Sequence, residues 1–249
     1  MKQIQNLMVA ACLTGMVNLC AIASSSFNWN GFYAGGATGM TKFSENHKLA
    51  FDDPGLYEVP GEFNYVTNAG ATKGPNAVLF LGYGKKSSRN PTYVGGEVGA
   101  DFMNHSNQVA DSALTLTSKR QAEFYANLRV GYVFKNDSIL YGLFGVAYTN
   151  FNRAIHFVPG GAYNKPKDMG SLTLNDVDST FESLGPQIGL GIMKPINDHL
   201  ILGFEYKLTL YGTKQIDLDD YMYPEDTPVG EYRSNTNTQA FNLRLSYAF

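Results

Sequence analysis

The residues of this sequence that could take part in catalysis or metal binding are few and lie far apart. His105 and Ser106 have the types of a general base and a nucleophile for acyl transfer. Neighbouring residues of a strand point to opposite faces, so these two side chains would meet only if the chain bends between them. His47, His156 and His199 show no spacing typical of metal ligands. We therefore predict no catalytic site, no metal site and no bound cofactor.

Acidic and tyrosine residues gather near the C-terminal end, between residues 212 and 236. This candidate recognition loop contains Asp217, Asp219, Asp220, Tyr221 and Tyr223. It lacks the Gly and the closing Glu of a calcium-binding loop, which favours solvated surface charge over a calcium site. Tyrosines at such a place fit two roles, because they anchor binding partners and also form the belt at a membrane interface.

The elements that would position these residues are strands, because large apolar side chains alternate with small or polar ones. The chain ends on such a pattern, with Phe241, Leu243 and Leu245 on one face and Asn242 and Arg244 on the other. Segments of strand character occupy residues 31–40, 77–84, 92–102, 121–134, 138–150, 180–193, 200–210 and 239–249. Lengths of about ten residues suit tilted membrane strands. The fifth and sixth segments are apolar on both faces or rich in Gly, so their facing stays open.

Connections between these segments alternate between short and long. Short polar turns occupy residues 85–91, 135–137 and 195–198, and long connections occupy residues 43–76, 104–117, 151–179 and 212–236. Loops of that length are unusual in soluble domains but normal on the outside of outer-membrane barrels. We predict an all-β fold, an eight-stranded antiparallel transmembrane β-barrel with short periplasmic turns and long extracellular loops. An even strand count places both termini in the periplasm.

The first residues have the features of a secretory signal. Lys2 precedes an uncharged run over residues 4–23, which ends on small residues. We predict a cleaved signal peptide over residues 1–23 and a barrel over residues 24–249; a spanning helix and a lipid-acceptor Cys20 are alternatives. Cys12 and Cys20 both lie in the signal, so the mature chain forms no disulfide. A net charge of −3 makes nucleic acid an unfavourable partner.

Charged residues recur on the strand faces opposite the apolar rows. They are Glu97, Asp101, Glu123, Arg129, Glu205, Lys207 and Arg244. The interior of an eight-stranded barrel is just wide enough for side chains to fill. Opposite charges confined there would pair, because an unpaired buried charge costs several kcal/mol. We predict a stabilising ionic plug; a narrow or gated ion path is the alternative.

Both ends of the chain resemble a known family. The run Trp29-Asn30-Gly31-Phe32-Tyr33-Ala34-Gly35-Gly36 is similar to the opening strand, W-x-G-F-Y-x-G-G, of small outer-membrane barrels of the opacity-protein and porin-like surface-antigen family. Tyr247 and Phe249 lie in a run similar to the C-terminal signal read by the barrel-assembly machinery. The resemblance implies an eight-stranded barrel of the OmpA type and no enzyme. Family members include adhesins, surface antigens and envelope-tethering proteins.

The predicted function is that of a non-enzymatic protein of the bacterial outer membrane, which contributes to envelope integrity and presents its loops for adhesion or recognition. Its expected partners are outer-membrane lipids and lipopolysaccharide, the barrel-assembly machinery, and a host or cell-surface ligand of the loops. A small diffusion channel is the alternative. A third possibility, lipid A hydrolysis, rests on residues 104–107, which are similar to the His-x-Ser-Asn run of lipid A deacylases but lack its intervening residue.

Overall fold

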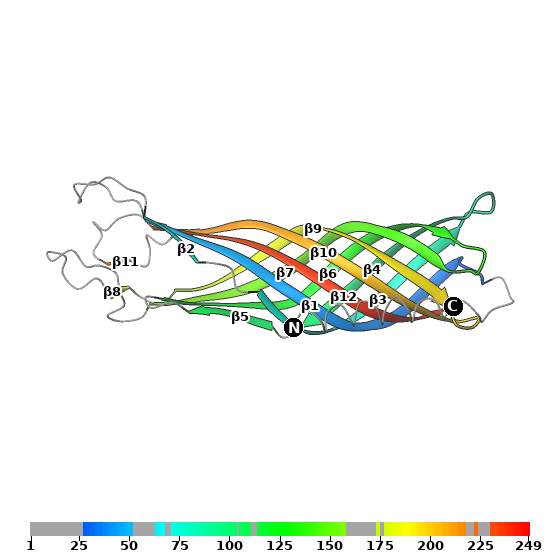
Figure 1. Ribbon diagram of the computed structural model, residues 1–249, viewed down its shortest axis with the longest axis horizontal. Coiled ribbons are helices and arrows are strands. Elements are labelled where there is room, and N and C mark those ends of the chain that lie inside the picture. The colour runs from blue at the N-terminus through cyan, green and yellow to red at the C-terminus, as the bar shows by residue number, and fades with distance from the viewer. Residues whose placement is uncertain are drawn as a thin grey trace, which may run out of the picture.

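The computed structural model shows a long barrel of antiparallel strands (Figure 1). It describes residues 27–51, 63–67, 71–103, 105–110, 114–157, 173–174, 177–217, 222–223 and 230–249, so the predicted signal peptide lies outside the described residues. The strands are β1 (Gly31–Phe51), β2 (Phe63–Thr67), β3 (Ala71–Lys86), β4 (Thr92–Met103), β5 (His105–Ala110), β6 (Leu114–Val133), β7 (Ile139–Phe157), β8 (Thr173–Leu174), β9 (Val177–Pro195), β10 (Leu200–Asp217), β11 (Met222–Tyr223) and β12 (Gly230–Ala248). No described helix is long and apolar enough to cross a membrane.

Eight strands close the barrel, which confirms the predicted fold class. Each pairs antiparallel with the next, in the order β12, β10, β9, β7, β6, β4, β3 and β1. The first and last strands complete the circle through a ladder that runs from Tyr33 opposite Ala248 to Phe51 opposite Gly230. The short strands β2 and β5 pair with β1 and β6 and continue the courses of β3 and β4.

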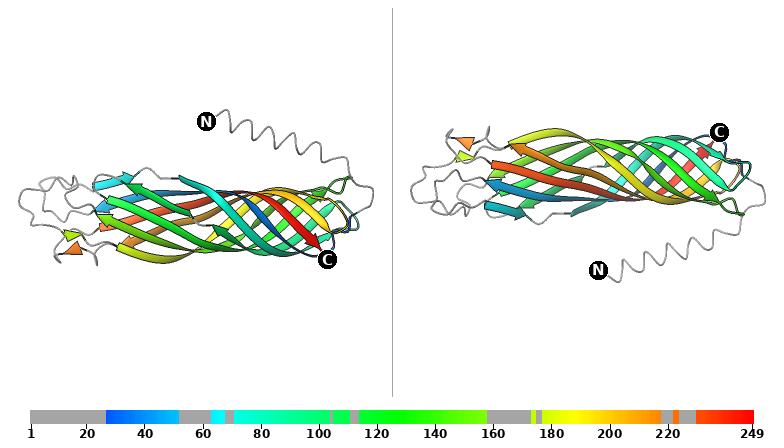
Figure 2. Two further views of the ribbon diagram at one scale, coloured as in Figure 1. Left: turned by 90° about the horizontal axis from the view of Figure 1, so that it is seen from below. Right: turned by 90° about the horizontal axis from the view of Figure 1, so that it is seen from above.

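The two ends of the barrel differ. Residues 87–91, 134–138 and 196–199 form tight connections at the short-turn end, where the C-terminus also lies (Figure 1). The strand ends that lead into the four long connections lie at the other end, which we call the long-loop end. There, the two-residue strands β8 and β11 pair with each other, Leu174 opposite Met222 and Thr173 opposite Tyr223, in a separate small sheet (Figure 2).

Side chains alternate between the outer face and the interior, except where the register shifts at residues 120–123 of β6 and 210–212 of β10. In β6, Phe124 and Leu128 are exposed on the outside, whereas Tyr125, Asn127 and Arg129 are buried inside. This reverses the arrangement of a soluble protein and is the pattern that lipid around a barrel requires. The strands with open facing follow the same rule: Phe144 in β7 and Ile188 in β9 point outward, and their neighbours Leu143 and Gln187 point inward.

The strands are longer than the sequence pattern predicts. β1 contains 21 residues and ends at Phe51, although we expected a strand over 31–40 and a loop from residue 43. β6, β7, β10 and β12 likewise extend into the predicted long connections. Beyond the apolar belt the outward side chains are polar, as with Asn235 and Arg233 in β12. The apolar contrast that marks a membrane strand therefore disappears, while backbone pairing continues.

Two glycines of the opening strand have unequal roles. A Cβ on Gly35 would overlap the Leu245 carbonyl oxygen and lie 2.6 Å from the Phe80 ring, inside the closing ladder. A Cβ on Gly36 would face outward, with its nearest atom, the Val78 carbonyl oxygen, 3.4 Å away. The backbone of β12 thus fits against β1 only because residue 35 has no side chain.

We predict that Gly35→Ala destabilises the barrel by about 1–3 kcal/mol, the usual cost of overpacking, because the added methyl group meets backbone. The matched variant Gly36→Ala should stay close to the parent. Heat-modifiable migration on gels after incubation in urea measures the folded fraction of each protein. Equal loss in the two variants would contradict the close approach at residue 35.

Candidate functional site: the ionic interior and its two ends

The seven charged residues predicted for the interior are all buried, with at most 3% of their surface exposed. Three more charged residues that the sequence analysis placed in or next to long connections join them, Glu45, Arg120 and Arg153. Among the described residues, the buried charged side chains are five acids, Glu45, Glu97, Asp101, Glu123 and Glu205, and five bases, Arg120, Arg129, Arg153, Lys207 and Arg244. The interior is therefore electrically balanced.

A four-way ion pair spans the barrel above the short-turn end. Arg129 Nη2 lies 2.7 Å from Glu97 Oε1 and 2.6 Å from Glu205 Oε2. Arg244 closes the ring, with Nη2 2.5 Å from Glu97 Oε2 and Nη1 2.8 Å from Glu205 Oε1. Since β4 and β6 form one wall and β10 and β12 the opposite wall, these contacts tie the two walls together. Each carboxylate meets two guanidinium groups, which offsets the cost of burying it.

Tyrosine hydroxyls complete this ring. Tyr33 and Tyr125 donate to the two oxygens of Glu97 at 3.2 and 3.1 Å, and Tyr141 donates to Glu205 at 2.7 Å. The guanidinium of Arg244 also lies 3.8 Å from the centre of the Phe80 ring. Rings and hydroxyls from several strands thus hold the four charges in one geometry.

A second polar group is centred on Glu123, nearer the long-loop end. Arg120 Nη2 lies 2.6 Å from Glu123, Gln187 donates to it at 3.1 Å, and the hydroxyl of Tyr211 donates to it as well. Asp101 is held separately, by two hydrogen bonds from Asn76 at 3.0 and 3.1 Å. These groups fill the middle of the interior.

Lys207 is the loosest member of the network. Its Nζ lies 4.0 Å from Asp101 and has no hydrogen-bond partner among the described residues, although it lies 4.2 Å from the centre of the Tyr125 ring. Arg120 Nη1 and Arg129 Nε likewise have no hydrogen-bond partner in the part of the chain that the structure describes. Buried polar atoms of this kind are normally satisfied by internal water, which neutral and charged groups in protein interiors share as a common partner.

A third group lies beyond the apolar belt and was missed by sequence reasoning. Arg153 Nη2 lies 2.8 Å from Glu45 Oε1, which also accepts hydrogen bonds from Ser118 and Thr236 at 3.0 and 3.3 Å. The rings of Phe43 and Phe151 stack beside it, 5.8 Å apart. Continuing the alternation of the first strand past residue 40 would have placed Phe43 and Glu45 on the inner face.

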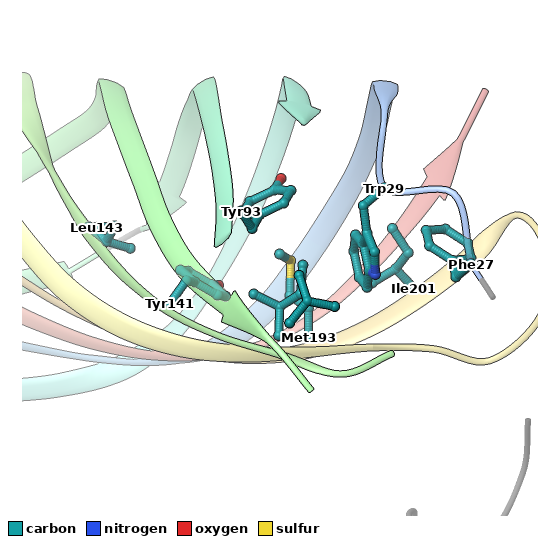
Figure 3. Packing of buried hydrophobic residues seen from close by; sticks show 9 residues of the cluster. Phe27, Trp29, Tyr93, Tyr141, Leu143, Met193 and Ile201 are labelled. Atoms are coloured by element: carbon teal, nitrogen blue, oxygen red, sulfur yellow. The ribbon is translucent and has the colours of Figure 1, made fainter. Parts of the chain in front are cut away.

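An apolar cluster fills the short-turn end (Figure 3). Phe27 and Trp29, which precede β1, enter the mouth of the barrel and pack edge to face, 4.7 Å apart. Trp29 in turn contacts the Tyr93 ring at 5.9 Å. The rest of the cluster comes from the walls and includes Val133, Ile139, Tyr141, Leu143, Met193 and Ile201. We call this cluster the apolar plug, because it packs in the mouth on the short-turn side of the four-way ion pair.

The other candidate residues are the five of the predicted recognition loop and the two of the predicted assembly signal. Asp217 ends β10 and Tyr223 lies in β11, whereas Asp219, Asp220 and Tyr221 are outside the described residues. The side chains of Tyr247 and Phe249 face outward and are 45% and 75% exposed, and their role as an assembly signal remains a prediction.

The proposed hydrolytic pair also stays unsupported. His105 and Ser106 are consecutive residues of β5, Ser106 is exposed, and its carbonyl oxygen accepts a hydrogen bond from Thr72 at 3.3 Å. No group of three or more His, Cys, Asp or Glu side chains with metal-binding geometry occurs in the described part of the chain.

A closed antiparallel barrel with an apolar outer belt and an ionic interior is the architecture of integral outer-membrane proteins. The profile of the family described as outer membrane protein beta-barrel domain matches residues 9–249, so the chain belongs to this family. It is therefore a protein of the bacterial outer membrane. Among curated protein sequences, none is significantly similar to it.

Solved structures support the fold. The outer membrane protein OprG of Pseudomonas aeruginosa is 13% identical, with a TM-score of 0.51 over 91% of this chain and 99% of its own. Neisserial surface protein A is 15% identical, with a TM-score of 0.35 over 88% and 97% of the two chains. Ail, the attachment invasion locus protein of Yersinia pestis, is 9% identical, with a TM-score of 0.36 over 86% and 99%. Only the first of these likenesses is close enough to bear on the fold.

We predict that Arg129→Met destabilises the barrel by about 3–5 kcal/mol, because it leaves two buried carboxylates short of a partner. Lys207→Met should cost less, since Asp101 keeps its two hydrogen bonds from Asn76. The exposed Lys73→Met is the surface control and should lie within about 0.5 kcal/mol of the parent. Urea unfolding in lipid vesicles measures the order, and an equal loss in the two buried variants would contradict it.

Proposed function

We propose that this protein is a non-enzymatic surface protein, which stabilises the outer membrane and recognises ligands through its long loops. The observation that carries the proposal is an interior occupied by side chains, together with strands that extend beyond the apolar belt and have polar outer faces there. The apolar plug and three polar groups occupy the interior, while the strands continue beyond the apolar belt. Such a frame holds loops away from the membrane surface, and loops on a rigid frame are the usual carriers of recognition.

The orientation belongs to the same proposal. The short-turn end faces the periplasm and the long-loop end faces outward, with both chain termini periplasmic. The described chain supports this, because Phe27 and Phe249 both lie near the short-turn end (Figures 1 and 3). The outer belt meets outer-membrane lipids and lipopolysaccharide, and the exposed rings of Tyr247 and Phe249 are available to the barrel-assembly machinery.

The segment over residues 212–236 is the proposed recognition loop, and its chemistry favours a cationic ligand. It contains six acids against two bases, with Tyr221 and Tyr223 among them, whereas its third tyrosine, Tyr232, is buried in β12. An acidic surface attracts a positively charged partner and speeds their encounter, and the effect weakens as salt rises. A basic host or cell-surface protein is the ligand class that fits.

A small diffusion channel is the second candidate. The observation that favours it is the set of buried polar atoms, such as Lys207 Nζ, that have no hydrogen-bond partner in the described chain and would be satisfied by internal water. The apolar plug and the four-way ion pair oppose conduction, because the plug packs in one mouth and the ion pair reaches from wall to wall.

We predict that cells displaying the protein bind a surface coated with basic protein better than cells without it. Replacing Asp219 and Asp220 by Asn should reduce binding, because it removes loop charge. Asp137→Asn with Asp198→Asn, two changes in short turns, is the matched control and should have no effect. Retained binding in the loop variant, or equal loss in both, would refute the assignment to this loop.

Planar-bilayer recording distinguishes the two candidates. The purified protein and a variant with Phe27→Ala and Trp29→Ala should both give no sustained openings, because the four-way ion pair still crosses the interior. Discrete, sustained openings from the unaltered protein would instead favour the channel. Opening only in the variant would show that the apolar plug is the barrier.

A further inference from the structure

Two of the eight ladders of the barrel stop partway along its length. The β3–β4 ladder ends at Asn76 opposite Met103, and the β9–β10 ladder ends at Thr209 opposite Gln187. The residue that follows each last pair toward the long-loop end is a proline, Pro75 in β3 and Pro186 in β9. Proline has no N–H to donate to a ladder. Each proline still lies within a ladder to its other neighbour, Pro75 with β1 and Pro186 with β7. Pairing of β3 with β4 and of β9 with β10 stops there.

Beyond the prolines, the described barrel consists of two four-stranded sheets. One, sheet A, contains β5, β6, β7 and β9; the other, sheet B, contains β10, β12, β1 and the course of β2 and β3. Two seams without backbone pairing in the described residues separate them, one between β3 and β5 and one between β9 and β10.

The connectivity leaves these sheets independent at the long-loop end. Residues 52–62 join β1 to β2 and residues 218–229 join β10 to β12, all within sheet B. Residues 111–113 and 158–176 join strands of sheet A. The chain crosses each seam only at the short-turn end, at residues 87–91 and 196–199. The sheets can therefore separate without stretching any connection.

Side chains hold the seams together in place of the ladders. Thr72 Oγ1 donates to the Ser106 carbonyl oxygen at 3.3 Å across one seam. Ser183 Oγ donates to the Tyr211 carbonyl oxygen at 3.2 Å across the other. Inside, the Glu45–Arg153 ion pair and the stacked rings of Phe43 and Phe151 join the two sheets. Ser118 also donates to Glu45 and Arg153 to Thr236, and the ring of Phe151 packs against that of Tyr211, so side chains and not a continuous backbone ladder join the sheets here.

One backbone contact bridges the sheets. Strand β8 belongs to the connection between β7 and β9 of sheet A, and β11 belongs to the connection between β10 and β12 of sheet B. Their pairing, Leu174 opposite Met222 and Thr173 opposite Tyr223, therefore joins loops that spring from the two sides of the β9–β10 seam.

We propose that β8 and β11 form a latch, and that its release lets sheets A and B move apart like jaws hinged at the level of Pro75 and Pro186. Opening exposes the aromatic and ionic groups between the sheets, Phe43, Phe151 and Arg153 among them, to the space under the loops. The motion does not depend on which ligand the loops bind. A ligand that displaces Met222 or Tyr223 from the pairing would act as an opener.

Distances between spin labels test this opening. Cys12 and Cys20 are replaced by Ser, and labels are attached to cysteines introduced at exposed positions. Lys119 in β6 and Asn235 in β12 give a pair across the two sheets, and Lys119 with Glu182 in β9 gives a control pair within sheet A. The latch is broken by Thr173→Pro with Leu174→Pro, which removes backbone donors. The same two positions changed to Ala form the matched control.

In vesicles, the broken latch should lengthen the distance across the sheets by about 5 Å, roughly one strand spacing, and leave the pair within sheet A unchanged. The Ala variant should match the parent. An unchanged distance across the sheets overturns the proposal. So does an equal increase in the Ala variant, because backbone pairing would then not be the latch.

Hydrogen exchange on the unaltered protein gives a second test that does not need the variant to fold. Residues 210–217 have ladder partners on one side only, in β12, whereas β7 is paired on both sides. Deuterium uptake should therefore be faster over residues 210–217 than over β7. Uptake as slow as in β7 would show that the seam is closed in the membrane and would overturn the proposal.

Discussion

Pairing of buried charges across the interior is the constraint on which this barrel depends. Lipid takes the apolar side chains on the outside, so alternation forces the polar ones inward, where eight strands leave little solvent. Glu97 and Glu205 come from opposite walls, and Arg129 and Arg244 each contact both carboxylates. Neither wall can pair all of its own charges, because each arginine also contacts the carboxylate of the opposite wall. Closing the sheet into a barrel therefore also completes the pairing of the interior charges.

Sequence reasoning predicted the barrel and the seven central charges because both depend on strict alternation. Beside apolar neighbours, Glu97 and Arg129 are plainly on the inner face. The same reasoning missed Glu45, Arg120 and Arg153, because the outward residues near them are polar and the strand pattern fades although the ladders continue. The apolar plug was missed for a different reason: Phe27 and Trp29 precede the first strand, and only the fold brings them back into the mouth.

The buried ion pairs also differ in how completely the strands around them are paired. The four-way ion pair sits where all eight ladders are intact, so the walls that carry it are fixed. The Glu45–Arg153 pair lies where two ladders have ended, and it is itself one of the contacts that join the two sheets. Buried ion pairs therefore act within a fully paired sheet in the membrane-embedded part. Beyond it, an ion pair is one of the contacts that hold two separate sheets together.

The chain has a single tryptophan, and it lies in the apolar plug. Its indole is 5% exposed and faces aromatic and aliphatic side chains, so its emission should be blue-shifted in the native protein. Intrinsic fluorescence thus reports on one mouth of the barrel without any label. Quenching of this fluorescence by a water-soluble agent would show when the Trp29 side chain leaves the apolar plug. That movement could then be followed separately from the unfolding of the strands.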